Sequence, residues 1–461
     1  MQQYTERLGT APLTRLLIVL SLPGIVSSIT TSLYNIVDTI WVGQVGHEAI
    51  AALTIVFPYQ ILFYAIGGGT GIGISALVSR RFGEKNIDAT NRVAGQIFFI
   101  SAFWGTVFLL IAVFFADPIL IFIGATPDIM DYARQYLVIT SYGAPLMILS
   151  MLVSALIRGS GDAIKPMIIM VVGTIVNIIL DPLLILGIGP FPELKVVGAA
   201  LATLIAQSCG AFLGLYFLFA KNTAYHIKPA QVMPSFRIII DIYHVGAPAS
   251  VLQIAESFAF MLYNIAVSSF GSVAIAAMGI AMRISDFAFM PVMGVSHGLL
   301  PIVGYCFGEG NYRRLWEALK KATTGIAIFL AIATVAMEVL APQILGIFTR
   351  EEDLLNVGVP AFRIMMASIT LVGPSMMIIT MFQGLGRGKT ALILSLIRQF
   401  IVFVPLLYLF KYLFGLTGIW VTMPVSDAVG FVISLLFILL EYRRHRKAGL
   451  LWQPTDSSGN R

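Results

Sequence analysis

Charged residues are scarce in this sequence of 461 residues, since Asp, Glu, Lys and Arg together make up only 11% of it. Hydrophobic residues make up 58%. A water-soluble chain of this length needs a much larger charged surface. The composition therefore excludes a soluble globular protein and predicts an integral membrane protein, with membrane lipids as its surroundings.

Cysteine and histidine are also rare, with two Cys and five His. Cys209 and Cys306 form no CxxC pair and both fall inside apolar runs, so the sequence gives no sign of a disulfide framework or a zinc site. It shows neither a nucleophile with a nearby base nor a repeated filter loop. We therefore expect no catalytic residue and no cofactor, and we disfavour both a membrane-embedded enzyme and a channel.

The net charge of +6 does not indicate nucleic-acid binding, because no basic face with interleaved aromatic residues lies outside the apolar runs. Basic clusters instead alternate with acidic ones between those runs, and Lys195, Arg350 and Lys411 are the exceptions on the basic-poor side. This bias predicts a multi-pass protein of the inner cell membrane with both termini in the cytoplasm. The first run is long enough to span, so we expect no cleaved signal peptide.

Apolar runs of about 20 residues or more, the length that crosses a bilayer as a helix, recur along the whole chain. We count twelve of them, at residues 14–41, 50–79, 93–116, 131–157, 163–187, 196–220, 238–268, 273–305, 315–341, 357–384, 391–413 and 417–441.

The two halves of the chain repeat one pattern: IAALTI…FGEKN at residues 50–86 returns as IAAMGI…FGEGN at residues 275–311. Six spans per half give both halves the same orientation, which is an arrangement found in secondary transporters. We predict an all-α membrane protein with two six-helix lobes related by a pseudo-two-fold axis along the membrane normal. The expected parts are an N-terminal lobe (1–220), a cytoplasmic linker (221–237), a C-terminal lobe (238–441) and a basic cytoplasmic tail (442–461).

Acidic side chains inside spans are costly and therefore point to function. Asp38 follows Tyr34 by one helical turn in the first span, and Asp181 follows Asn177 by one turn in the fifth. Thr203 in the sixth span reaches a similar depth. Their oxygens can form a cage for Na⁺ or carry an exchangeable proton. The alternative is that both acids only hydrogen-bond to neighbouring helices, with Asp181 and Pro182 simply ending a span.

Several segments resemble the multidrug and toxic compound extrusion (MATE) family, namely YNIVDTIWVGQVG, LVSRRFGE, ALIRGSGDAIKPM and NIILDPLLI. The resemblance implies a monomeric, twelve-helix exporter that exchanges Na⁺ or H⁺ for cationic or amphiphilic small molecules. It also implies that the coupling ion binds at Asp38, Asn177, Asp181 and Thr203, with the Ala199 carbonyl as a further ligand.

The C-terminal half carries Glu256, at a place where one branch of the MATE family has a functional acid. The usual acidic partner is missing from residues 357–384, so a second coupling site is in doubt. Glu256 lines the cavity or pairs with Arg283; both interpretations stay open. Asp286 near Arg283 is expected to form an ion pair. The candidate cavity or substrate residues are Tyr34, Glu256, Arg283 and Met261.

Other features inside spans have weaker interpretations. Pro23 either bends the first span during transport or forms a static kink. The glycine-rich run at residues 67–73 lies in mid-span and predicts close helix packing, not a phosphate loop. Arg363 and Arg398 are expected to have structural roles, and Asp427 has no assigned role.

Two transport functions therefore remain. The first is a cation-coupled antiporter that exports drugs or metabolites by alternating access. The second is a flippase for lipid-linked precursors from the same wider superfamily, which usually has a more cationic cavity. The sequence does not identify the substrate or decide between Na⁺ and H⁺.

Overall fold

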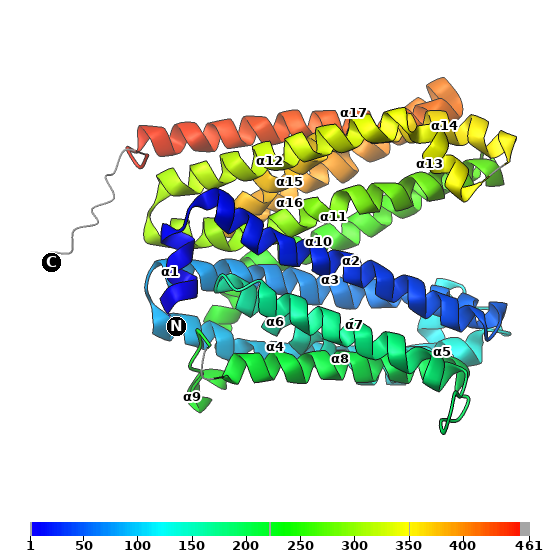
Figure 1. The fold of residues 1–461 in the computed structure, drawn as a ribbon, viewed down its shortest axis with the longest axis horizontal. Coiled ribbons are helices and arrows are strands. Elements are labelled where there is room, and N and C mark those ends of the chain that lie inside the picture. The colour runs from blue at the N-terminus through cyan, green and yellow to red at the C-terminus, as the bar shows by residue number, and fades with distance from the viewer. Residues whose placement is uncertain (1, 221–222, 350, 452–461) are drawn as a thin grey trace.

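The structure is a computed structural model that describes residues 2–220, 223–349 and 351–451, and every regular element in these ranges is a helix (Figure 1). A short helix, α1 (Gln2–Thr10), precedes the N-terminal lobe. The helices of that lobe are α2 (Leu13–Gly43), α3 (His47–Gly83), α4 (Ile87–Ile123), α5 (Met130–Tyr142), α6 (Ala144–Gly159), α7 (Ile164–Ile185) and α8 (Lys195–Phe219).

A short linker helix, α9 (Pro229–Val232), leads to the C-terminal lobe, which lies beside the first lobe in Figure 1. The helices of this second lobe are α10 (Phe236–Ser268), α11 (Ser272–Glu309), α12 (Tyr312–Val339), α13 (Ala341–Phe348), α14 (Glu352–Met366), α15 (Ile369–Gly384), α16 (Gly388–Leu396), the π-helix η1 (Ile397–Val402) and α17 (Phe403–Lys447).

Ten helices of the described chain are long and apolar enough to cross a membrane, and the bent pair α5 and α6 makes an eleventh span. The twelfth comes from the last of the ten, a continuous stretch of 60 residues from Gly388 to Lys447. As one helix it would be about 90 Å long, about three times the thickness of a hydrocarbon core. Its backbone breaks at Gly415, with φ 63° and ψ −136°, and the chain reverses there (Figure 1). The predicted twelve spans are confirmed.

Two of the predicted spans are broken where the sequence analysis expected one helix each. Residues 131–157 form α5 and α6, which meet at an angle of 51° around Gly143. Pro145 follows directly in the first turn of α6, where its missing N–H costs no helix hydrogen bond. Residues 357–384 form parts of α14 and α15, which are separated at Ala367 and Ser368.

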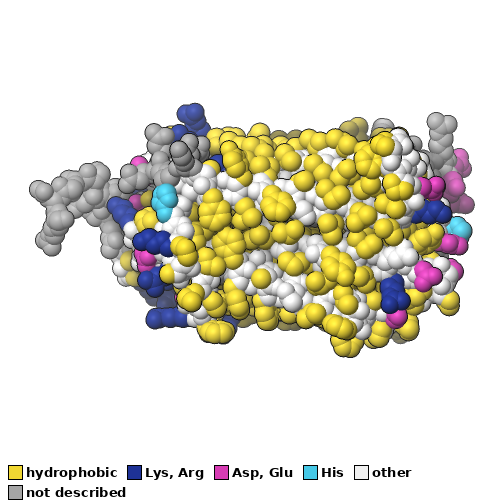
Figure 2. Space-filling model, turned by 90° about the horizontal axis from the view of Figure 1, so that it is seen from below, with side chains coloured by type: hydrophobic (Ala, Val, Ile, Leu, Met, Phe, Trp, Pro, Cys, Tyr) yellow, Lys and Arg dark blue, Asp and Glu magenta, His cyan; other side chains and the backbone are white. Residues whose placement is uncertain are grey.

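Apolar side chains cover the middle of the molecule, and charged side chains gather at its two ends (Figure 2). Large apolar residues such as Phe114, Phe122 and Tyr216 are well exposed on this band. In water such a surface would be a large unfavourable patch, whereas in a bilayer it is the expected outer face. The surface therefore supports a protein that spans a membrane.

One end of the molecule, which we call the basic end, holds α1 and several turns rich in Lys and Arg (Figure 1). Helices α2 and α10 begin there, and α3 and α11 end there. The basic residues that mark it are Arg80, Arg81, Lys85, Arg313, Arg314, Arg387, Arg443, Arg444, Arg446 and Lys447.

The lobes join in a seam between α3 and α10 and between α2 and α11, which lies in the halves of these helices next to the basic end. A Cβ atom at Gly69 would lie 2.5 Å from the backbone nitrogen of Ser250 on α10, and one at Gly294 would lie 2.8 Å from that of Ile25 on α2. Only glycine permits such close approach of two helices. The predicted close packing of residues 67–73 is confirmed.

The lobes diverge away from the basic end, as Figure 1 shows for the ribbons near α5 and α14. The far halves of the seam helices contain Gly43 and Gly279. A Cβ atom at Gly43 would meet only Ile50 of its own lobe, and one at Gly279 would meet nothing within 4 Å. The structure thus shows a conformation that is closed at the basic end.

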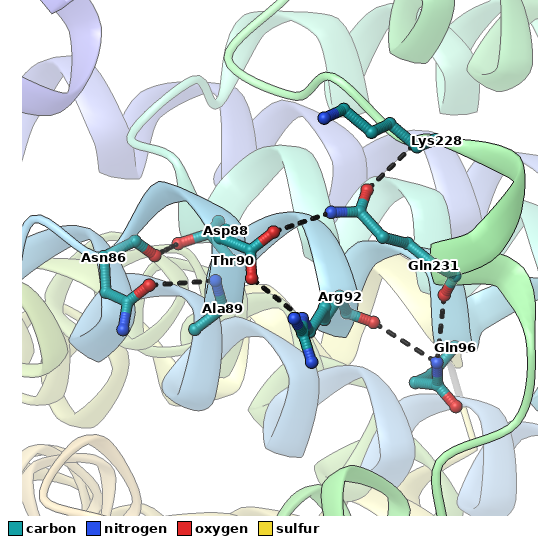
Figure 3. Close-up of polar contacts among 8 residues, drawn as sticks. All are labelled: Asn86, Asp88, Ala89, Thr90, Arg92, Gln96, Lys228 and Gln231. Atoms are coloured by element: carbon teal, nitrogen blue, oxygen red, sulfur yellow. Dashed lines mark hydrogen bonds and ion pairs between the residues drawn. The ribbon is translucent and has the colours of Figure 1, made fainter.

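The described part of the linker is bound to α4 of the N-terminal lobe (Figure 3). Gln96 donates to the carbonyl oxygens of Gln231 and Met233, at 3.2 and 3.0 Å, and accepts from the backbone N–H of Ser235 at 2.7 Å. Gln231 also donates to Asp88 at 3.1 Å. The linker therefore packs as part of the N-terminal lobe up to the start of α10.

Candidate functional site

Asn177 and Asp181 lie one turn apart on α7 and are completely buried. The Asn177 side-chain amide donates to Oδ1 of Asp181 at 3.0 Å. This bond leaves Oδ1 of Asn177 and Oδ2 of Asp181, both of which are buried and receive no hydrogen bond. Helix α7 continues beyond Pro182 and ends at Ile185, so Asp181 and Pro182 lie in its last two turns.

Asp38 faces this pair from α2, and its side chain is 8% exposed. Its Oδ1 atom is also buried without a hydrogen-bond donor. The Asp38 carboxyl lies within electrostatic range of Asp181 and of two tyrosines on other helices, Tyr64 and Tyr136. Nothing in the sequence distinguishes these two tyrosines from the other aromatic residues of the spans, so they could not be singled out before the fold was known.

Thr203 of α8 completes the group. Its hydroxyl and that of Tyr34 on α2 are 3.1 Å apart, so one hydrogen bond ties the two helices together. Ala199 lies one turn before Thr203 and is fully buried. The helix pairs the Ala199 carbonyl with the Thr203 amide, which leaves this oxygen one further lone pair for a ligand. Two direct contacts thus join predicted residues, Tyr34 with Thr203 between α2 and α8 and Asn177 with Asp181 on α7.

The arrangement is suited to a cation. Three buried oxygens, from Asp38, Asn177 and Asp181, lack donors, and buried acceptors without partners are destabilising. A hard cation bound by carboxylate, amide and hydroxyl oxygens would satisfy them, and so would protons on the carboxylates. The described residues contain no cluster of three or more His, Cys, Asp or Glu side chains that could hold a metal ion, so a metal here would rely on two acids and neutral oxygens.

In the C-terminal lobe, Glu256 of α10 is half-buried and accepts a hydrogen bond from Nε2 of Gln399 at 2.7 Å. The interpretation that Glu256 pairs with Arg283 is wrong, because no ion pair joins them within 4.0 Å in the described chain. The expected ion pair of Asp286 with Arg283 is likewise absent from the described residues, and both side chains are exposed. The sequence placed these charges near each other along one helix, but they point into open surroundings.

Asp427, which had no assigned role, binds Arg398 at 3.0 Å between two spans of the C-terminal lobe. Arg363 donates to the backbone oxygen of Glu338 at 3.2 Å. Both arginines thus have partners within the lobe, and their structural roles stay a prediction. Met261, a candidate substrate residue, is 45% exposed on α10.

Pro23 lies inside α2, and the helix runs unbroken from Leu13 to Gly43. The Pro23 carbonyl accepts a hydrogen bond from the Ser27 hydroxyl at 2.9 Å. Gly24, the next residue, packs against Gly294 of the other lobe. Pro23 thus lies at the seam, one half of α2 away from Asp38.

Multidrug export proteins of two Staphylococcus species resemble this chain over nearly its whole length. The multidrug export protein MepA of Staphylococcus aureus (strain MSSA476) is 25% identical over 431 residues, which cover 93% of this chain and 94% of MepA. MepA of Staphylococcus saprophyticus is 27% identical over 421 residues, which cover 91% and 92%.

Solved structures agree in fold. A crystal structure of MATE in the bent conformation superposes with a TM-score of 0.91 at 27% identity, covering 97% of this chain and 99% of the other. An outward-facing multidrug resistance MATE transporter superposes with a TM-score of 0.89 at 28% sequence identity, covering 96% of this chain and 98% of the other. A transporter from Pyrococcus furiosus, described as having a binding pocket of reverse polarity, superposes with a TM-score of 0.88 at 28% sequence identity. The match covers 97% of this chain and 98% of the other.

The MatE family model matches residues 23–183 and 248–409, which are most of the two lobes. The two matched segments contain both halves of the internal repeat and, of the candidate site, Tyr34, Asp38, Asn177 and Asp181. The family consists of transporters, not enzymes. The chain therefore belongs to the multidrug and toxic compound extrusion (MATE) family.

Proposed function

We propose that this protein is a secondary active antiporter that exports cationic or amphiphilic small molecules in exchange for Na⁺ or H⁺. The observation that carries the proposal is the set of three buried oxygens without donors on Asp38, Asn177 and Asp181. A site with two acids and no basic residue in contact binds a cation or protons and releases them with a change in its surroundings. The relatives named multidrug export proteins support an organic substrate.

The parts of the proposed transporter follow one another along the sequence. Residues 1–220 form the lobe that binds the coupling ion, 221–237 the linker, 238–441 the second lobe and 442–461 a basic tail. Residues 1, 221–222, 350 and 452–461 lie outside the described residues. The protein acts as a monomer, since each chain contains both lobes.

We place the basic end in the cytoplasm, because Lys and Arg are retained on that side of the inner cell membrane. The structure then corresponds to an outward-open state. Its similarity to the outward-facing MATE transporter supports this assignment. Transport requires the glycine seam to open and the opposite ends of the lobes to approach.

Bending of α2 near Pro23 connects the coupling ion to this motion. Pro23 and Gly24 lie at the seam, whereas Asp38 lies in the far half of the same helix. A change in how Asp38 contacts α7 and α8 therefore shifts the seam through one continuous helix. Tyr34 takes part because its hydroxyl joins α2 to Thr203.

A flippase for lipid-linked precursors remains the second candidate, because the fold does not distinguish it. The Pyrococcus furiosus transporter with reversed pocket polarity superposes almost as well as the multidrug transporters do. The charge of the site is the discriminating feature. In this chain the buried ionisable residues between α2 and α7 are acids, which favours a cation.

The deciding experiment uses purified protein in liposomes loaded with a cationic fluorescent dye. Na⁺ and proton gradients are imposed separately, and dye efflux is followed. The proposal is supported if one of the two gradients drives dye efflux and if the Asp181→Asn variant loses this efflux. The gradient that drives efflux then identifies the coupling ion. Efflux that ignores both gradients, or that persists in Asp181→Asn, contradicts it.

A further inference from the structure

A π-helix, η1, lies at residues 397–402 between α16 and α17 of the C-terminal lobe. Such turns are rare and occur mainly at functional sites, because they shift the direction of the following side chains. The segment IRQFIV itself contains neither proline nor glycine, but Pro405 follows it by three residues and cannot donate a helix hydrogen bond to the carbonyl of Ile401. Contacts with other helices hold the segment as well.

The second span of α17 provides a receptacle for Arg398, formed by Ser426, Asp427 and Gly430. The Ser426 hydroxyl donates to the backbone oxygen of Arg398, and Asp427 accepts from its guanidinium at 3.0 Å. A Cβ atom at position 430 would lie 2.6 Å from Cγ of Arg398, so glycine leaves the space that the arginine stem fills. Ser368 binds the second oxygen of Asp427 at 2.8 Å.

This receptacle is buried, with Ser426 and Asp427 at 2% and 6% exposure. A buried ion pair usually adds little net stability compared with apolar side chains of similar size. A buried ion pair can, however, hold its residues in one fixed geometry. Here the pair fixes Arg398, and this determines where the residues after Arg398 point.

Gln399 and Phe400, the next two residues, both contact α10. Gln399 donates Nε2 to Oε1 of Glu256 at 2.7 Å, and the ring of Phe400 stacks on Phe258 with centroids 5.7 Å apart. The amide oxygen of Gln399 is buried without a donor. No described residue donates to the second oxygen of Glu256. The two atoms that lack a donor here, Oε1 of Gln399 and the second oxygen of Glu256, are both hydrogen-bond acceptors.

We infer that Arg398 and its receptacle are positioning residues, which hold η1 so that Gln399 orients Glu256 toward substrates carrying a protonated amine. The second carboxylate oxygen of Glu256, to which no described residue donates, matches an ammonium group with an N–H donor. A quaternary ammonium group has no N–H and gains only the charge attraction. The inference rests on the proposed export function and adds the class of cation that this lobe prefers.

The test uses two matched dyes, a dansyl group linked to a dimethylamine and its trimethylammonium analogue, in the liposome efflux assay. The principal variant is Arg398→Met with Asp427→Leu, which removes both charges and leaves neither buried alone. Gln399→Leu removes the orienting residue itself. The control is Arg387→Met with Glu441→Leu, an ion pair of the same lobe that lies at the basic end.

We expect the KM of the protonated amine to rise about tenfold in both Arg398→Met with Asp427→Leu and Gln399→Leu, as the loss of one hydrogen bond to a charged group predicts. The KM of the trimethylammonium dye and the maximal rate of both dyes should change little, as should all values in the control. Equal effects on both dyes, or the same KM change in the control, would overturn the inference.

Glu256→Gln separates this inference from the proposed function. If it raises the KM of the amine while efflux stays coupled to the ion gradient, both stand. If it changes the KM of neither dye, the assignment of Glu256 to the substrate is wrong. The proposal that export is coupled to an ion bound at Asp38 is not affected by that result. Positioning is measured on its own by carbodiimide labelling of Glu256 followed by mass spectrometry.

Labelling should accelerate in Arg398→Met with Asp427→Leu, because withdrawal of Gln399 uncovers the carboxylate. An unchanged labelling rate would show that the receptacle does not act on Glu256. If this double variant fails to fold, Ser426→Ala replaces it. That variant loses only the donor to the Arg398 carbonyl, and the same KM difference between the dyes, in a smaller amount, is expected.

Discussion

Asn177 donates its side-chain amide to Oδ1 of Asp181 at 3.0 Å, one turn further along α7. The bond fixes the orientation of both side chains, so that their remaining oxygens are the acceptors left over. Asp38 on α2 supplies a third such acceptor. These oxygens are the basis of the proposed cation site.

Asp38→Asn and Asp181→Asn should each abolish gradient-driven efflux and leave membrane insertion and yield nearly unchanged. Each substitution removes a negative charge that the buried site needs for a cation, and neutral amides are tolerated inside a membrane protein. Efflux of a cationic dye from liposomes measures the effect. Asp286→Asn, at an exposed acid on α11, is the matched control. Normal rates in either site variant would remove the residue from the coupling site.

Asn177→Ala should weaken ion affinity about tenfold while the maximal rate is largely kept, because one neutral ligand and one hydrogen bond to Asp181 are lost. Thr203→Ala should have a similar or smaller effect, and Thr203→Ser should restore affinity because it keeps the hydroxyl that meets Tyr34. Titration of purified protein with Na⁺ at two pH values gives the affinities. Ion dependence equal to that of the wild type would mean that these side chains are only structural.

The twelve spans could be predicted because hydropathy and length are local properties of the sequence. The pairing of Asn177 with Asp181 could also be predicted, since residues four apart share one face of a helix. Bends were harder to foresee. The break between α5 and α6 lies within one apolar run, where Gly143 and Pro145 mark a breakpoint but do not give the angle between the two axes.

Contacts between separate helices could not be predicted. In a soluble protein the apolar stripe of a helix shows which face is buried, but lipid-facing and buried faces are both apolar here. Glu256 was therefore considered with Arg283 on the next helix, whereas its partner is Gln399, from far along the chain. The pairing of Arg398 with Asp427 and the π-helix that it accompanies were missed for the same reason.

Single cysteines should report the orientation of the chain in the membrane. Replacements at Lys85, Lys165 and Arg314 should react with an impermeant thiol reagent only from the cytoplasmic side, and those at Asp128 and Lys195 only from the outside. Arg350, which belongs to the same prediction, lies outside the described residues. Intact cells expose the outer side of the membrane to the reagent, and inverted vesicles expose the cytoplasmic side. One reproducible inversion would contradict the proposed placement of the basic end.

Gln96→Leu should release the linker from α4, because it removes the acceptor of the Ser235 amide and both donations to the linker backbone. Exchange of the Ser235 amide with deuterium should become about tenfold faster, as expected for the loss of one local hydrogen bond. The amide of His226, held separately by Asn91, is an internal control. Equal acceleration at His226 would indicate general unfolding of the linker.

Gly73→Ala should disfavour the state that is closed at the basic end. The new methyl group would meet the backbone of α10 at Ile242 and Gly246, where no side-chain movement can make room. Overpacking of this kind costs about 1–3 kcal/mol, which is enough to shift a two-state population about tenfold.

Spin labels at Lys85 in the N-terminal lobe and Lys320 in the C-terminal lobe report the separation of the lobes at this end. The distance distribution should gain a longer component in Gly73→Ala and stay unchanged in Gly279→Ala, where a Cβ atom meets nothing within 4 Å. Since export requires both states, the variant should also transport more slowly while it still binds the coupling ion. An unaltered distance distribution would show that the lobes do not separate at the glycine seam.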